Sequence, residues 1–232
     1  FLFAAILSGV IYPIVMGWQW GGGWLASIGF SDFAGSTLVH STGGAAALAG
    51  AIIIGPRLGR FTKSGAPAPL KPFAASSIPL VTIGVFILWL GWFGFNGGSE
   101  LMVSNVGEAN AVSLVFVNTN AAAAGGVIGA LVFSKFLFGK FDLSMSLNGA
   151  IGGLVSITAE PLAPTPELAA IIGAIGGILV VISIIVLDKS KIDDPVGAIS
   201  AHGTCGIWGL IAVTLSNGDA TLGAQLYGTV VI

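Results

Sequence analysis

Long, nearly uninterrupted apolar segments restrict the fold of this chain more than any other feature. An α-helix needs about 20 consecutive apolar residues to cross the hydrocarbon core of a bilayer. Only 8% of the residues are charged and 55% are hydrophobic, whereas a soluble domain carries about 25% charged residues. The sequence therefore predicts an all-α integral membrane protein, a polytopic helical bundle. The expected spans are residues 1–19, 33–54, 77–96, 108–138, 143–159, 168–187 and 195–216, with an incomplete eighth from residue 222.

Glycines four positions apart indicate where these helices approach one another. In lipid, small residues let helix backbones come close together. We expect close packing at three such pairs: Gly125 and Gly129, Gly149 and Gly153, and Gly173 and Gly177.

The charged residues predict the orientation in the membrane. All basic residues fall in three connections, 55–75, 134–142 and 188–194, and the intervening connections carry acidic residues only. Cytoplasmic loops carry the excess of Lys and Arg. We therefore expect a multi-pass protein of the cell (plasma) membrane with these three loops in the cytoplasm. Trp20, Asp32 and Ser99 would then face outside. The net charge of −2 argues against a nucleic-acid partner.

One nine-residue pattern occurs twice, and it contains both histidines of the chain. Asp32, Gly35 and His40 have the same spacing as Asp194, Gly197 and His202. Counted from the charged loops, the two helices run in opposite directions, which predicts an inverted-topology repeat with its site near the membrane midplane. Each histidine would lie roughly 10 Å from its end of the membrane. This count leaves about a third of the hydrocarbon core between the rings, so it does not predict their contact.

Three interpretations of these histidines compete. They could be structural residues bonded to neighbouring backbone, but an ionisable side chain inside a membrane is a functional hypothesis by default. A metal site is disfavoured because the only further soft ligand is Cys205, and structural sites usually have four ligands. An intramembrane enzyme would need a nucleophile or carboxylate beside the histidines, and none is visible within the spans that carry them. We therefore expect no metal, no cofactor and no enzymatic activity.

Four segments resemble signatures of the ammonium transporter family (Amt/Mep, with the Rh proteins as relatives). They are the residues 32–44 beginning Asp-Phe-Ala-Gly-Ser-Thr-Leu-Val-His, 91–99 (Gly-Trp-Phe-Gly-Phe-Asn-Gly-Gly-Ser), 116–121 (Phe-Val-Asn-Thr-Asn-Ala) and 201–206 (Ala-His-Gly-Thr-Cys-Gly). The resemblance extends over essentially the whole chain and implies a fold of eleven membrane helices in two inverted halves. The chain would be a fragment that lacks the first three helices, the last helix and the cytoplasmic tail.

The resemblance also implies a role for each matched residue. His40 and His202 correspond to the paired pore histidines, and Trp92 would line the pore wall. Trp20 and Ser99 correspond to the outer site that recruits the ammonium ion. Phe95 corresponds to one ring of a phenylalanine gate. Asp32 would be structural, as a helix cap near the recruitment site.

These roles imply transmembrane passage of ammonium or ammonia through a narrow hydrophobic pore, with deprotonation at its mouth. The family assembles as a homotrimer in the lipid bilayer and meets a PII-type regulator through the cytoplasmic tail. An ammonium sensor of the same fold, which signals to a cytoplasmic partner, is the alternative function.

Overall fold

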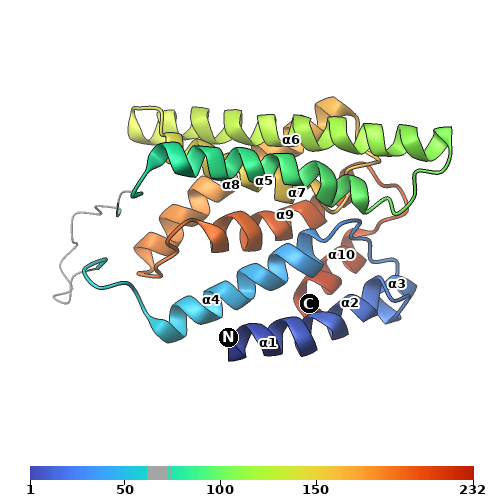
Figure 1. Cartoon of the computed structure of the whole chain (residues 1–232), viewed down its shortest axis with the longest axis horizontal. Coiled ribbons are helices and arrows are strands. Elements are labelled where there is room, and N and C mark those ends of the chain that lie inside the picture. Colours follow the sequence, from blue (N-terminus) through green and yellow to red (C-terminus); the bar gives the residue numbers. More distant parts are fainter. Residues whose placement is uncertain (62–72, 74) are drawn as a thin grey trace.

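Every predicted span contains a helix in the computed structural model, which describes residues 1–61, 73 and 75–232. This described part is all-helical (Figure 1). Its helices are α1 (Leu2–Ile6), α2 (Tyr12–Gln19), α3 (Trp24–Ser27), α4 (Thr42–Ile54), α5 (Ile78–Gly98), α6 (Val106–Phe138), α7 (Leu143–Ile157), α8 (Pro166–Lys189), α9 (Cys205–Ala212) and α10 (Leu222–Val231). Three π-helical segments continue into helices: Leu7–Ile11 joins α1 to α2, Ser36–Ser41 precedes α4, and Ile199–Thr204 precedes α9.

Five of the seven predicted spans are also long enough in the structure to cross a membrane. Within the described residues, five helical stretches are long and apolar enough to cross a membrane: Leu2–Ser27, Ser36–Ile54, Ile78–Gly98, Val106–Phe138 and Pro166–Lys189. The other two apolar helices, Leu143–Ile157 and Ile199–Leu215, have 10–17 residues. The first ends within two residues of the expected end, and beyond it the carbonyls of Thr158 and Ala159 accept hydrogen bonds from Ala34 and Phe33.

The helices that carry the histidines begin later than predicted. We expected starts near Phe33 and Pro195, with Pro195 at a first helical position. Instead Gly35 has φ +111° and Gly197 has φ +76°, and glycine adopts this left-handed region at little cost. Each motif glycine thus ends a turn, and Pro195 lies in that turn. The helical segment starts after the glycine, so both starting points were wrong for the same reason.

Close packing at the predicted glycines is confirmed. Helices α6, α7 and α8 pack tightly against one another. A Cβ atom at any of the six glycines would overlap a neighbouring helix, mostly at its backbone: Gly173 and Gly153 would both strike the Ala122 carbonyl, and Gly125 the Ala170 carbonyl. These three helices form the most closely packed part of the bundle.

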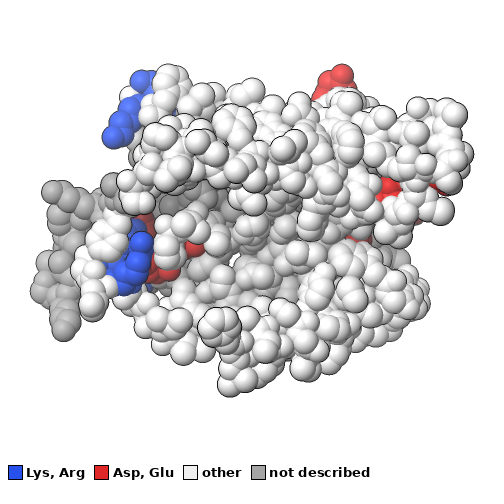
Figure 2. All heavy atoms as spheres, in the orientation of Figure 1, with Lys and Arg blue, Asp and Glu red and all other residues white. Residues whose placement is uncertain are grey.

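The helices alternate in direction, and the charges separate between the two ends. In Figure 1, α4, α6 and α8 end at the left, and α5, α7 and α9 start there. All described basic residues lie at that end, and Figure 2 shows the visible Lys and Arg there. Trp20 and Ser99 close α2 and α5 at the opposite end. Two residues of the predicted basic loop 55–75, Lys63 and Lys71, lie outside the described residues.

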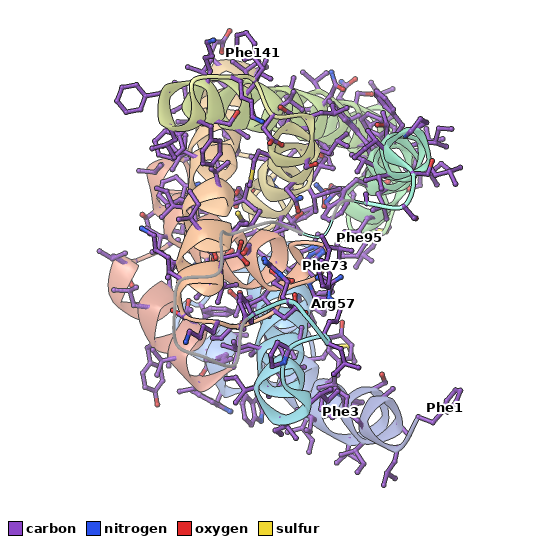
Figure 3. All side chains as sticks on the ribbon, turned by 90° about the vertical axis from the view of Figure 1, so that its left-hand side faces the viewer. Phe1, Phe3, Arg57, Phe73, Phe95 and Phe141 are labelled. Carbon is purple, nitrogen blue, oxygen red and sulfur yellow. The ribbon has the colours of Figure 1, made fainter. Side chains whose placement is uncertain are left out.

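An ionic cluster joins the connection after α4 to the connection after α8. Arg57 donates to both carboxylate oxygens of Asp193, from Nε at 2.7 Å and Nη2 at 2.8 Å, and its backbone N–H donates to the same side chain at 2.9 Å. Arg60 bonds Asp188 and lies 3.5 Å from Asp193. Figure 3 shows Arg57 beside Phe73 at this end, with the guanidinium 5.0 Å from the ring centre. Sequence reasoning missed this cluster, which fixes the segment before His202 to the end of α4.

We expect the Asp193 carboxylate to contribute stability that acid removes. The Arg57 side chain, together with its backbone N–H and Arg60, lowers the pKa of Asp193 below its ordinary value. The contribution is therefore complete above the unfolded-state pKa of about 4 and declines as pH falls through the lower folded-state pKa. Asp193→Asn should lower the thermal unfolding temperature at pH 7 and should lose less stability than wild type on acidification below about pH 4. Unfolding temperatures from pH 7 to pH 3 test this, with exposed Asp219→Asn as control. An acid transition unchanged by Asp193→Asn would contradict it.

Candidate functional site

The two copies of the repeated motif form similar turns ahead of each histidine. The Asp32 carboxylate is buried and accepts four backbone N–H bonds, at 2.8–3.1 Å, from Gly35, Ser36, Thr37 and Leu38. The Asp194 carboxylate accepts one, at 3.1 Å, from Ser200, which lies six residues on, as Leu38 does from Asp32. The N–H groups of a first helical turn have no partner within the helix. Asp32 supplies those partners, in the manner of a helix cap.

The two motif helices cross at glycines. A Cβ atom at Gly44 would overlap the backbone of Gly203, and one at Gly206 would overlap the Ser36 carbonyl and the Ser41 hydroxyl. Gly44 and Gly206 are equivalent positions in the repeat, four residues past His40 and His202. In Figure 1, α4 and α9 run in opposite directions through the middle of the bundle. The close crossing brings the first turns of the two helices together.

The crossing places the two imidazole rings in direct contact. Nδ1 of His202 lies 3.2 Å from Nδ1 of His40. The ring centres are 5.1 Å apart and the planes differ by 29°. His40 is 7% exposed, and its Nε2 has no hydrogen-bond partner among the described residues. The residue counting left a gap between the rings, but the rings are in contact where the helices cross at their glycines.

Both histidines lie in π-helical segments, Ser36–Ser41 and Ile199–Thr204. The N–H of His40 bonds the carbonyl of Gly35, five residues earlier, at 3.0 Å. Single π-helical turns are rare in proteins overall, but those that occur are often at functional sites. Sequence reasoning predicted ordinary helix here and gave no signal of this wider turn.

Two aromatic residues of α5 surround His40. Its ring centre lies 5.0 Å from that of Trp92, nearly parallel at 23°, and 5.4 Å from that of Phe95. Trp92 is 6% exposed, and its Nε1 donates to the Thr158 hydroxyl at 2.9 Å. Figure 3 shows Phe95 on the inner side of α5. The structure thus brings His40, His202, Trp92 and Phe95 into one cluster.

The residues expected at the outer end are only partly brought together. Trp20 Nε1 donates to the Asp32 carbonyl at 2.8 Å, so its indole is fixed against the first motif turn. The Ser99 hydroxyl donates to the Phe95 carbonyl, one helical turn back, at 2.8 Å. Among the hydrogen bonds and aromatic contacts of the described residues, none joins Trp20 to Ser99.

A facing pair of neutral imidazoles presents one hydrogen-bond donor and one acceptor on its outer nitrogens. In the Nδ1–Nδ1 hydrogen bond, one ring donates a proton and the other accepts it. A neutral imidazole has one N–H and one bare nitrogen. The ring that donates at Nδ1 therefore has a bare Nε2, and the ring that accepts has an Nε2–H. The pair can accept a hydrogen bond at one outer nitrogen and donate at the other. The roles reverse when a proton binds the bare Nε2, the shared proton passes to the other ring, and that ring releases its Nε2 proton, so that both rings end neutral.

In the described residues, no three His, Cys, Asp or Glu side chains lie close enough together to hold a metal ion. The titratable side chains of the cluster are the two imidazoles, and the aromatic rings lie against His40.

Comparison with known proteins gives consistent results. A family model described as Ammonium Transporter Family matches residues 1–231. A putative ammonium transporter of Synechocystis is 45% identical over 235 residues, which cover 100% of this chain and 52% of the relative. Ammonium transporter Amt2 of Archaeoglobus fulgidus is 42% identical over 222 residues, which cover 91% of this chain and 46% of the relative. The chain spans about half the length of these curated relatives.

Solved structures match the fold as well. A protein titled "Sensor Amt Protein" superposes with a TM-score of 0.86 at 38% identity, over 96% of this chain and 57% of the other. Mep2 of Candida albicans superposes with a TM-score of 0.86 at 29% identity, over 99% of this chain and 53% of the other.

Proposed function

This chain belongs to the ammonium transporter family, and on that premise we propose that it forms part of a narrow hydrophobic pore for transmembrane ammonium or ammonia transport. The contact between His40 and His202, with 3.2 Å between their Nδ1 atoms, is the observation that carries the proposal. It places one donor and one acceptor side by side where the two motif helices cross.

The pore favours neutral ammonia over the ammonium ion. A bare charge in an apolar passage is expensive because it loses its hydration. Ammonia carries N–H donors and one lone pair, which match the outer nitrogens of the imidazole pair. We propose that ammonium is deprotonated at the pore mouth, that ammonia then bonds His40 and His202, and that the pair relays the proton.

The other proposed site residues lie along the path that the substrate takes from outside to the histidines, or beside them. Trp20 is 40% exposed and can hold a cation over its indole face, and the Ser99 hydroxyl can accept a hydrogen bond from the ion. Phe95 forms an apolar gate between this recruitment site and His40, which excludes hydrated ions. Trp92 lines the pore beside His40. Asp32 shapes the turn that leads into the pore.

The proposed setting follows from the charges and the family. The protein would be a homotrimer in the plasma membrane, with the basic loops in the cytoplasm. A PII-type regulator would bind through a cytoplasmic tail.

An ammonium sensor is the second candidate function. It is favoured by the superposition on the structure titled "Sensor Amt Protein". A sensor would use the same recruitment site but pass its signal to a cytoplasmic partner.

Flux through the full-length gene product, reconstituted in liposomes, separates the two functions. Ammonium trapped inside is measured after an inward gradient is applied, with protein-free liposomes as control. We expect uptake well above the control. Uptake equal to the control, from correctly folded protein that still binds ammonium, would overturn transport and favour the sensor.

A further inference from the structure

Thr158 connects three parts of the site without touching the histidines. It is fully buried at the end of α7. Its hydroxyl donates to the Leu154 carbonyl at 2.7 Å and accepts from Trp92 Nε1 at 2.9 Å. Its carbonyl accepts from the Ala34 N–H at 3.0 Å, within the first motif turn. Both hydrogen-bonding functions of the hydroxyl are therefore used.

The bond to Trp92 fixes the direction of the indole ring. Trp92 packs against both Phe95, with 5.7 Å between ring centres, and His40, at 5.0 Å. Stacking alone defines the orientation of a ring only loosely, because its directionality is weak. A hydrogen bond from Nε1 needs a defined direction, and among the described residues Thr158 is the partner of that N–H.

The orientation of Trp92 in turn bounds the space next to His40. An indole held nearly parallel to the imidazole presents its flat face to the pore. A tilted indole would widen the passage on one side of the His40 imidazole and narrow it on the other.

Resting on the proposed function, we propose that Thr158 is a positioning residue that sets the size selectivity of the pore through Trp92. Without the hydroxyl, the buried indole N–H loses its partner, and unpaired buried donors are unfavourable. The ring then turns toward another acceptor. The passage beside His40 consequently discriminates less between ammonium and methylammonium, which is larger by one methyl group.

Thr158→Val is the decisive variant because it keeps the shape of the side chain and removes the hydroxyl. Thr158→Ser keeps the hydroxyl on a smaller side chain. Thr82→Val is the matched control: Thr82 lies on α5, as Trp92 does, and its hydroxyl likewise donates to the carbonyl four residues earlier, at 3.0 Å. Thr158→Cys replaces the hydroxyl with a weakly bonding thiol and serves if the valine variant does not fold.

The readout is the ratio of methylammonium to ammonium flux in liposomes that contain the full-length protein. A ratio is independent of how much folded protein each preparation contains. Thr158→Val should raise it about fivefold or more, a part of the ~10–200-fold that one methylene is worth in an apolar pocket. Thr158→Ser and Thr82→Val should stay close to wild type.

Parallel loss of both fluxes at a constant ratio would overturn the inference, because a merely structural role has that effect. An equal rise in Thr158→Ser would overturn it too. Failure of the proposed function looks different: wild-type protein would then carry neither substrate.

Discussion

Asp32→Ala is expected to destabilise the protein by about 3 kcal/mol or more. The substitution leaves four buried N–H groups, from Gly35 to Leu38, without acceptors. Loss of an ordinary helix cap costs about 0.5–2 kcal/mol, and each unsatisfied buried donor about 1–3 kcal/mol. Against a total stability of about 5–15 kcal/mol, this is a large fraction. The thermal midpoint of detergent-solubilised protein should fall by roughly 6–12 °C.

Two further variants make the Asp32 result specific. Asp32→Asn keeps the shape but replaces one accepting oxygen with an amide N–H₂, and we expect an intermediate loss. Asp219→Ala removes an exposed carboxylate and should leave the midpoint unchanged. A midpoint for Asp32→Ala within about 2 °C of wild type would show that water replaces the carboxylate and that the turn does not need it.

Gly44→Ala is expected to abolish transport while the helices remain folded. The added methyl group would overlap the backbone of Gly203, and neither helix backbone can yield without moving its histidine. Separation of the helices lengthens the 3.2 Å contact between His40 and His202. A displacement of about 1 Å at a reacting group can lower a rate about 10²-fold, so we expect flux to fall by about this factor.

Gly43→Ala is the matched control. Gly43 is the adjacent residue on the same helix, and a Cβ atom there meets nothing within 4 Å. Both substitutions replace glycine by alanine inside a helix, which intrinsically favours helix by about 1 kcal/mol. Equal flux in the two variants would show that the glycine crossing does not set the distance between the rings.

The apolar runs and charged loops were sufficient to predict that each span is helical, although not where the two histidine helices begin. Their length and polarity act locally, so the span 108–138 and the glycine packing of α6, α7 and α8 could be derived without a structure. The identity of the cluster around His40 came from the family resemblance, since Trp92 and Phe95 alone are typical of ordinary packing.

The contacts within the site could not be predicted because they depend on backbone geometry and on residues distant in sequence. The left-handed conformations of Gly35 and Gly197 shift both helix starts. Ring contact further depends on the crossing of Gly44 with Gly203, which are 159 positions apart in the chain. Thr158 has no sequence signal, since its partner Trp92 is 66 residues away.

The imidazole pair is tested most directly by electrical current. Liposomes that contain the full-length protein receive an ammonium pulse, and the current is compared among wild type, His40→Ala and His202→Ala, with ammonia flux measured in parallel. Proton transfer by a positioned side chain contributes about 10²–10⁴-fold, so loss of either ring should remove the current. We predict a clear wild-type current that disappears in both variants. Wild-type current in either variant would contradict a proton relay through His40 and His202.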